Sequence, residues 1–328
     1  MSFDLEFEKP LAEIDKRIQS LLRRGDRLKA DDRVHLRELQ QQLDQRTKEL
    51  YASLTAWQRV QVARHKNRPY TTDYIKLMCD DYFELRGDRR FGDDRAIQGG
   101  MATLDGRTVM ILGHQKGRDT KERQECTFGM AHPEGCRKAE RMMLHAERFH
   151  MPVITLIDTP GAFPGLEDEQ RGISQAIAQN LFVMSRLHTP ILSIVIGEGG
   201  SGGALAIGVA DRILMLENSV YTVASPEAAA SILWRDSSYA SSAAEAMKIT
   251  APELLQLGLI EDIIPEPLGG AHRNVREAAA LVKQAITRHL NELQGIPVAQ
   301  LVNQRYLRYR TIGSQVAVTL GESVSAPA

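Results

Sequence analysis

The glycine-rich segment from Gly197 to Ala204 (GEGGSGGA) is the part of this sequence best suited to chemistry. It follows an apolar run at 191–196 and opens a stretch that can form a helix. Glycines let the backbone approach a ligand closely, and the first N–H groups of a helix have no acceptors within it. Such donors bind anions and stabilise oxygens on which negative charge develops. The segment therefore predicts chemistry through an oxyanion or an enolate, and it requires no side-chain nucleophile.

A dinucleotide-binding fingerprint also fits this glycine spacing. Gly197, Gly199 and Gly202 match its pattern, and Glu217 lies about 20 residues on, where a ribose-binding acid would be. That fingerprint normally occupies the first strand–helix turn of its domain, whereas another strand–loop–helix unit precedes it here. Glycines that merely permit tight packing of a helix on a strand explain the spacing equally well.

A nucleophile elbow is a third match, because Gly199-x-Ser201-x-Gly203 has its spacing. A serine hydrolase would need an acid and a histidine beside Ser201. The candidates that follow in the chain are Asp211, Asp262 and His272. Such residues are common, so Ser201 is better explained as a small packing residue. No lysine follows the glycines, which argues against a phosphate-binding loop.

A second loop, from Asp158 to Gly165 (DTPGAFPG), follows another apolar run at 153–157. Its two prolines restrict the backbone, so a rigid loop is expected. Continuous apolar runs are typical of strands buried on both faces, as in parallel sheets. A helix at 174–186 separates the two runs. The repeated order of strand, loop and helix predicts an α/β fold.

Other elements follow from periodicity and from helix caps. Leucines at helical spacing predict helices over about 10–55, broken at Gly25 into a hairpin. Arg68-Pro69 marks a boundary, and Ser225-Pro226 starts a helix. The remaining expected elements are a helix from Thr71 or Thr72 through Phe83, a hairpin of strands at 101–104 and 108–112, helices at 135–150 and 274–293, strands at 212–216, 220–223 and 260–264, and a frayed tail beyond Thr319.

Composition and length exclude several classes of protein. The 328 residues carry a formal net charge of −1, which argues against a general nucleic-acid binder. The sequence starts without a signal-peptide pattern, and no apolar run is long enough to span a membrane. The three cysteines have no metal-knuckle spacing, so no metal site and a cytoplasmic location are expected. We expect an N-terminal helical arm over 1–66, a main domain over 67–295 and a C-terminal extension over 296–328.

Five blocks of sequence, taken in order, resemble the α subunit of bacterial acetyl-CoA carboxylase carboxyltransferases. Each block alone is weak, but their order and spacing are specific, and the resemblance covers nearly the whole chain. The blocks are 113–122 (GHQKGRDTKE) with Phe128-Gly129-Met130 and 133–139, Asp158–Gly165, Ile196–Ala206, Ser225–Glu227 with Ser231–Trp234, and Ile264–His272.

The resemblance implies a crotonase-like (ClpP/crotonase) α/β fold of repeated ββα units with an N-terminal helical arm. It also implies a β subunit of the same fold, with a zinc ribbon, in an α2β2 assembly. The reaction would transfer the carboxyl group of carboxybiotin, held on a biotin carboxyl carrier protein, to acetyl-CoA. The product, malonyl-CoA, commits carbon to fatty acid synthesis, and a separate biotin carboxylase would consume the ATP.

Site residues also follow from the resemblance. The N–H groups of Gly203 and Ala204 would stabilise charge on the ureido oxygen of biotin, and biotin N1 itself would take the proton from the acetyl methyl group. The biotin pocket would be formed by Gly161, Ala162, Phe163, Gly165, Gly199, Gly200 and Gly202. CoA phosphates or the partner would meet Lys116, Arg118, Lys121, Arg137 and Lys138.

The sequence departs from the family pattern at four places, namely Gln124–Thr127, Cys136, Ile173 and Ala229. A negative charge at Glu125 would weaken attraction for CoA phosphates. Three alternatives to the carboxyltransferase remain: another crotonase-like acyl-CoA enzyme, a serine hydrolase using Ser201, and a non-catalytic assembly subunit.

Overall fold

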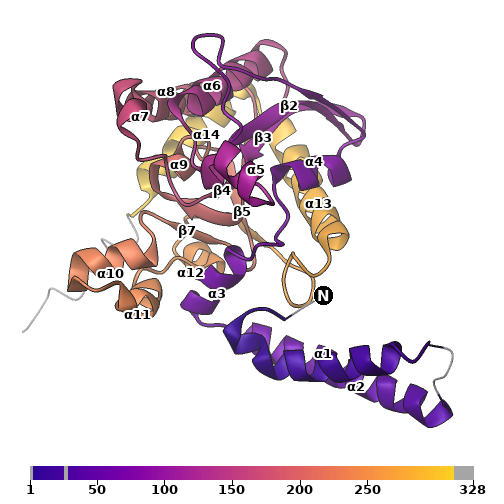
Figure 1. The fold of residues 1–328 in the computed structure, drawn as a ribbon. Coiled ribbons are helices and arrows are strands. Elements are labelled where there is room, and N and C mark those ends of the chain that lie inside the picture. Colours follow the sequence, from indigo (N-terminus) through magenta and orange to yellow (C-terminus); the bar gives the residue numbers. More distant parts are fainter. Residues whose placement is uncertain (1–2, 26–28, 314–328) are drawn as a thin grey trace, which may run out of the picture.

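The computed structural model describes residues 3–25 and 29–313, so the tail expected to fray beyond Thr319 lies outside the described residues. The N-terminal hairpin consists of α1 (Lys9–Leu22) and α2 (Ala30–Ala52), which lie side by side and project from the body (Figure 1). Its own small core contains Ile14, Ile18, Leu21 and Leu39. The predicted helical hairpin is therefore confirmed, and Gly25 ends its first arm in a left-handed conformation at φ 53°.

The body is built on one mixed sheet in the order β1-β2-β3-β4-β5-β6-β8, with β7 paired to β5. The first three strands pair antiparallel, and β3, β4, β5, β6 and β8 run parallel to one another. The strands are β1 (Asp81–Glu84), β2 (Ile97–Leu104), β3 (Arg107–His114), β4 (Val153–Thr159), β5 (Ile191–Gly200), β6 (Arg212–Leu216), β7 (Val220–Thr222) and β8 (Asp262–Ile264). The expected hairpin is confirmed, because β2 and β3 pair from end to end across Asp105-Gly106.

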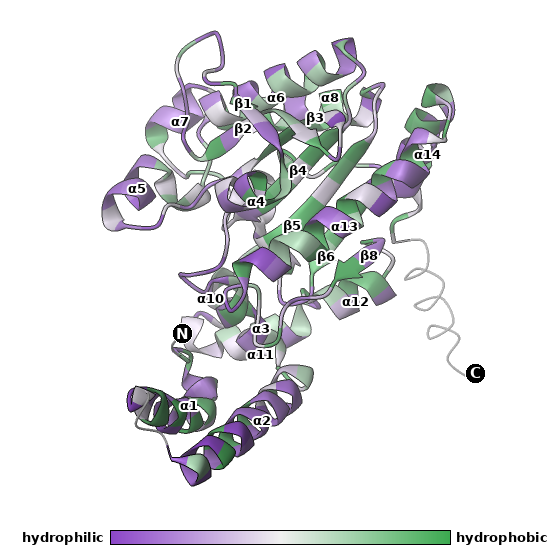
Figure 2. Ribbon diagram, turned by 90° about the vertical axis from the view of Figure 1, so that its right-hand side faces the viewer, coloured by the Kyte–Doolittle hydropathy of each residue, from purple (hydrophilic) through white to green (hydrophobic). Residues whose placement is uncertain are grey.

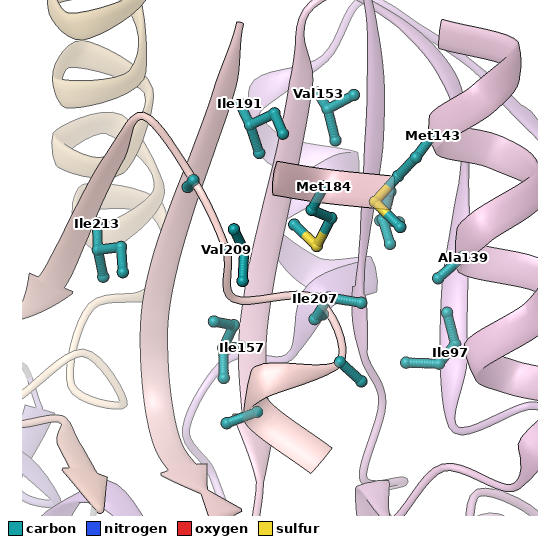
Figure 3. Close-up of a cluster of buried hydrophobic side chains, with 14 of the residues drawn as sticks. Ile97, Ala139, Met143, Val153, Ile157, Met184, Ile191, Ile207, Val209 and Ile213 are labelled. Carbon is teal, nitrogen blue, oxygen red and sulfur yellow. The ribbon is translucent and has the colours of Figure 1, made fainter. Parts of the chain in front are cut away.

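Helices cover both faces of this sheet, so alternate residues of its central strands enter two different cores. Val153 and Ile157 of β4 face the core beneath α6 (Pro133–Arg148) and α8 (Ile173–Arg186), which Figure 3 shows. Ile154 and Leu156 face the opposite core, where α4 (Thr71–Met78) and α13 (Val275–Gln294) pack. Burial on both faces explains the continuous apolar runs of the sequence. In Figure 2 these strands form a green band between the helical layers.

The shorter helices lie around the edges of the sheet. Ser225 caps α10, its side chain accepting the N–H of Ala228 at 3.1 Å, which confirms the predicted helix start. The other helices are α3 (Ala56–Ala63), α5 (Thr120–Glu125), α7 (Leu166–Gln170), α9 (Ser201–Leu205), α10 (Pro226–Trp234), α11 (Ala240–Ala246), α12 (Ala251–Gln256), α14 (Val298–Thr311) and the 3-10 turns Glu6–Glu8, Thr127–Gly129 and Ser237–Tyr239. Among the described residues, none of these helices is both long and apolar enough to cross a bilayer.

The structure differs from the sequence-based expectation in the segment that leads to β1. The helix expected to run through Phe83 ends at Met78, and Asp81–Glu84 form the edge strand β1. The threonines do not cap that helix through their side chains, since Thr71 donates to the carbonyl of His114 instead, at 2.7 Å. Farther toward the N-terminus, α3 packs on α11, β5 and β7 of the body.

The C-terminal helix α14 was not predicted, and a buried arginine holds it in place. The Arg305 side chain forms two bonds of 2.8 Å with the carboxylate of Asp211. It also donates to three backbone carbonyls, those of Met184, Leu187 and Thr189, at 2.7–2.9 Å. One side chain thus joins α14 to the end of α8 and to the loops that precede β5 and β6.

Candidate functional site

The glycine turn, residues 197–204, lies where β5 runs into α9. The strand continues to Gly200 rather than ending near Ile196, because Thr159 of β4 and all three residues of β7 pair with this part of it. The chain then reverses at Ser201, which has a left-handed φ of 49°. Ser201 is exposed and Gly202 half-buried, whereas Gly203 and Ala204 are buried. The first four amides of α9 have no acceptor within the helix, so these donors are available at the turn.

Close packing explains most glycines of the turn. A Cβ atom added at four of these positions would lie less than 3.0 Å from a neighbouring atom, closer than real Cβ atoms come. The fifth, Gly202, has room, since its nearest neighbour would be a methyl group of Ile177 at 3.4 Å. The crowded positions and their neighbours are Gly197 with Asp158, Gly199 with Tyr221, Gly200 with Pro160 and Gly203 with Gly161.

The second loop, 158–165, packs directly against this turn. The backbone of Gly203 rests on the carbonyl of Gly161 and on the amide of Ala162. The Thr159 hydroxyl donates to the carbonyl of Gly161 at 2.7 Å and accepts its N–H at 3.1 Å, which fixes the start of the loop. Farther along, the ring of Phe163 packs on Gly165. The structure thus brings the residues expected to form the biotin pocket and the oxyanion donors into one region.

An ion-pair network lies beneath the two loops. Lys116 Nζ is 2.7 Å from Asp158 Oδ1 and 3.0 Å from Glu198 Oε2. Arg64 Nε approaches the other oxygen of Glu198 at 2.6 Å and reaches Glu227 of α10 as well. Burial alone would lower the pKa of the Lys116 ammonium, but Asp158 and Glu198 outweigh it and the pKa is raised. The Lys116 ammonium is therefore charged at neutral pH.

The five cations expected to meet CoA phosphates or the partner lie in different surroundings. Lys116 is held by the network above, and Lys138 is buried with its ammonium 2.6 Å from Asp93 and from the carbonyl of Asp94. Arg137 donates to the carbonyl of Arg171. Arg118 is exposed, pairs with Asp73 and lies over the Tyr70 ring, 4.2 Å from its centroid. Lys121 stands exposed on α5. Arg118 and Lys121 alone of the five are exposed, so they are the two best placed to meet a phosphate.

The acid and base partners of a serine hydrolase are engaged elsewhere. Asp211 binds Arg305, and Asp262 pairs with Arg288 and His289. The His272 ring stacks on that of His65 with centroids 3.8 Å apart. None of these contacts involves Ser201, so the three candidates do not assemble into a triad with it.

A histidine–carboxylate pair beside Phe163 was not predicted from the sequence. His132 Nδ1 lies 2.5 Å from Asp168 Oδ1, and the His132 ring is 4.8 Å from that of Phe163. Arg171 adds a bond of 2.9 Å to Glu134, which further ties α7 to α6. These contacts hold the far end of the 158–165 loop. No local pattern indicates such a pair, because its members are 36 residues apart in sequence.

The positions that depart from the family pattern are accommodated without disrupting the turn. Glu125 pairs with Arg95, which offsets the negative charge expected to repel CoA phosphates. Cys136 and Ala229 are buried in α6 and α10, and Ile173 opens α8. Burial raises the pKa of the Cys136 thiol to about 12, so it stays protonated at neutral pH. Within the described residues no cluster of three or more metal-binding side chains occurs.

The chain is similar to one family of proteins over nearly its whole length. A family model described as acetyl co-enzyme A carboxylase carboxyltransferase-like matches residues 4–313. The acetyl-coenzyme A carboxylase carboxyl transferase subunit alpha of Geobacter metallireducens is 52% identical over 309 residues, covering 94% of this chain and 96% of that protein. The protein of the same name from Synechococcus elongatus is 54% identical over 313 residues, covering 94% of each chain.

Solved structures share the fold at lower identity. A Pseudomonas malonate decarboxylase hetero-tetramer in complex with coenzyme A contains a chain with a TM-score of 0.58 and 21% identity, covering 77% of this chain and 98% of that one. Transcarboxylase 12S gives a TM-score of 0.53 and 21% identity, covering 66% of this chain and 42% of that one. At such identity the likeness concerns the fold, which is the crotonase-like α/β fold expected from the sequence.

Proposed function

This chain belongs to the family of acetyl-CoA carboxylase carboxyltransferase α subunits, and on that premise we propose how it works. With a β subunit it transfers the carboxyl group of carboxybiotin to acetyl-CoA, giving malonyl-CoA for fatty acid synthesis. The biotin is carried on a biotin carboxyl carrier protein, and biotin carboxylase consumes the ATP. The enzyme works in the cytoplasm as an α2β2 assembly.

The contact between the glycine turn and the 158–165 loop is the observation that carries this proposal. Gly203 and Ala204 have amides without helical acceptors, and Gly203 rests on Gly161 and Ala162. We assign these two amides to the ureido oxygen of biotin, on which charge develops as the carboxyl group leaves. Donors fixed in place before reaction stabilise such charge without reorganising.

The biotin pocket is assigned to the glycines of the turn and to the loop that faces them. The pocket residues are Gly161, Ala162, Phe163, Gly165, Gly199, Gly200 and Gly202. Because the His132–Asp168 pair and the ring packing on Phe163 fix the outer end of the loop, this wall is preorganised. For CoA phosphates or the partner we retain Arg118 and Lys121, the exposed cations. Arg118 pairs with Asp73 but stays exposed, whereas Lys116, Arg137 and Lys138 are buried or half-buried and also held by acceptors of the chain itself.

An exposed apolar surface beside the turn supports the proposal of a β-subunit partner. Residues 231–239 at the end of α10 are exposed without interruption, and Ile232 and Leu233 have exposed fractions of 76% and 65%. Val223, which directly follows the strand that pairs with Gly200, is exposed as well. Large exposed apolar patches mark sites of protein association. Figure 1 shows α10 and α11 projecting from the body near this edge.

The test is carboxyl transfer from malonyl-CoA to free biotin, measured with this chain alone and after mixing with a cognate β subunit. Transfer that occurs only in the mixture supports the proposal, and a purified complex without transfer refutes it. Leu233→Asp is expected to weaken assembly with the β subunit by at least about tenfold, because it places a charge in an apolar contact. Leu144→Asp, an exposed leucine on α6, serves as the matched control.

A further inference from the structure

Lys116 occupies a position that phosphate binding does not explain. It lies just past β3, whereas Asp158 lies near the end of β4 and Glu198 in the last part of β5. These three strands are neighbours in the parallel part of the sheet, so their carboxyl ends meet at one edge. The ammonium of Lys116 lies between the carboxylates of the other two, at 2.7 and 3.0 Å.

Each of the two carboxylates belongs to a different segment of the site, either the 158–165 loop or the glycine turn. Asp158 begins the 158–165 loop, and its Oδ1 also accepts the backbone N–H of Glu198 at 2.9 Å. Glu198 belongs to the glycine turn, and Arg64 holds its second oxygen. Gly197 has no side chain to separate the two, since a Cβ atom there would collide with the carboxylate of Asp158. The ammonium therefore links the loop to the turn at their bases.

The positive charge of Lys116 is needed to offset repulsion between the two carboxylates. Asp158 and Glu198 are both buried and lie next to each other, so without a cation between them their ionised forms would repel. Burial would raise the pKa of Glu198, but Lys116 and Arg64 outweigh it and lower the pKa. The side chain of Lys116 has an exposed fraction of only 16%. Because the Lys116 ammonium is paired with two carboxylates, it is poorly placed to bind a ligand from solvent.

We infer that Lys116 is a positioning residue that fixes the 158–165 loop against the glycine turn, and that it does not bind CoA. This inference rests on the proposed function, in which the turn and the loop form the biotin half of the site. Lys116 acts through Asp158 and Glu198 on the placement of the Gly203 and Ala204 amides. Its loss affects the biotin side of the reaction and leaves the CoA side unchanged.

The experiment uses Lys116→Met in the full chain, assembled with a wild-type cognate β subunit. Biotin-dependent decarboxylation of malonyl-CoA yields kcat and a separate KM for each substrate. We expect kcat/KM for biotin to fall about 100-fold, as for a misplaced oxyanion donor, while KM for malonyl-CoA stays within about twofold. A raised KM for malonyl-CoA that depends on salt, with the biotin parameters unchanged, would show a phosphate contact and overturn the inference.

The matched control is Lys283→Met on α13, where a lysine pairs with Asp105 at 2.7 Å away from both loops. Its kinetic parameters should equal those of the wild type. If Lys116→Met does not fold, Lys116→Gln, which can still donate to one carboxylate, is measured in the same way.

Hydrogen exchange of the isolated chain tests the inference independently of activity. In Lys116→Met the amides of 159–165 and 197–204 are expected to exchange at least tenfold faster, with the α13 amides unchanged. Equal protection of both loops in variant and wild type would overturn the inference even if the complex shows no transfer. Absence of transfer in the wild-type complex, together with loosened loops in the variant, would refute the proposed function alone.

Discussion

Alanine substitutions at two neighbouring glycines, Gly203 and Gly202, test whether contact with the 158–165 loop positions the amide donors of the glycine turn. Both variants keep the amide N–H, and both add a single methyl group to α9. At Gly203 the methyl carbon would lie well under 3.0 Å from the carbonyl of Gly161 and 2.9 Å from the amide of Ala162. At Gly202 it would only touch a methyl group of Ile177 at 3.4 Å. Gly203→Ala therefore pushes the turn away from the 158–165 loop, whereas Gly202→Ala does not.

The size of the effect follows from this geometry. Restoring an ordinary contact of 3.4 Å requires the turn and the loop to separate by about 1 Å at Gly203. A misplacement of about 1 Å in a catalytic site costs roughly 100-fold in rate, equivalent to about 2.7 kcal/mol in barrier. Overpacking should also lower the free energy of unfolding by about 1–3 kcal/mol. We expect Gly202→Ala to lose less than about tenfold in rate, because the flexible end of Ile177 can move.

Transfer from malonyl-CoA to biotin is measured for both variants in complex with the β subunit, and thermal unfolding is followed in the same samples. Equal rates for Gly203→Ala and Gly202→Ala would refute the argument that contact with Gly161 positions the donors. A loss confined to stability, with normal turnover at low temperature, would refute it as well. Either result would move the oxyanion donors away from Gly203.

Three further predictions concern parts of the structure outside this contact. Arg305→Met should destabilise the chain by about 3–5 kcal/mol in denaturant unfolding, because it leaves the buried carboxylate of Asp211 uncompensated; a loss below about 1 kcal/mol would contradict this. Burial and the neighbouring His65 lower the pKa of His272 to about 3, so its stabilising contribution is complete above pH 6.5 and is lost as the pH falls toward 3. His272→Phe should therefore flatten the decline of melting temperature between pH 7 and 5, whereas parallel curves would count against this assignment. Ser201→Ala should retain most transfer activity, and covalent labelling of Ser201 by a fluorophosphonate would instead favour a hydrolase.

The central strands and the site loops could be predicted from the sequence because their signals are local. The apolar runs at 153–157 and 191–196 are long enough to identify buried strands, and Ser225-Pro226 has the pattern of a helix start. By contrast, Asp81–Glu84 lie at the edge of the sheet with three of four residues exposed, so β1 gives no alternating pattern. For this reason the sequence predicted that the preceding helix continues through Phe83, whereas it ends at Met78.

Contacts between distant residues could not be predicted in this way. Lys116 meets partners 42 and 82 residues farther along the chain, at Asp158 and Glu198. The family resemblance implied that this lysine meets CoA phosphates or the partner. Only the order of β3, β4 and β5 in the sheet brings the three side chains together. The same holds for Arg305, whose acceptors lie 94 to 121 residues earlier.

The Arg305 contacts also have a consequence for synthesis of the protein. During translation, the carbonyls of Met184, Leu187 and Thr189 and the carboxylate of Asp211 emerge long before their donor. Until α14 has left the ribosome, the bonds from Arg305 are missing and, among the described residues, the Asp211 carboxylate keeps only the N–H of Ile191. Water must replace the missing donors, because buried acceptors without partners are costly. The end of the sheet near Asp211, where β6 begins, must therefore stay hydrated in the nascent chain. Products that terminate before residue 305 would keep this edge open and become substrates for quality-control proteases.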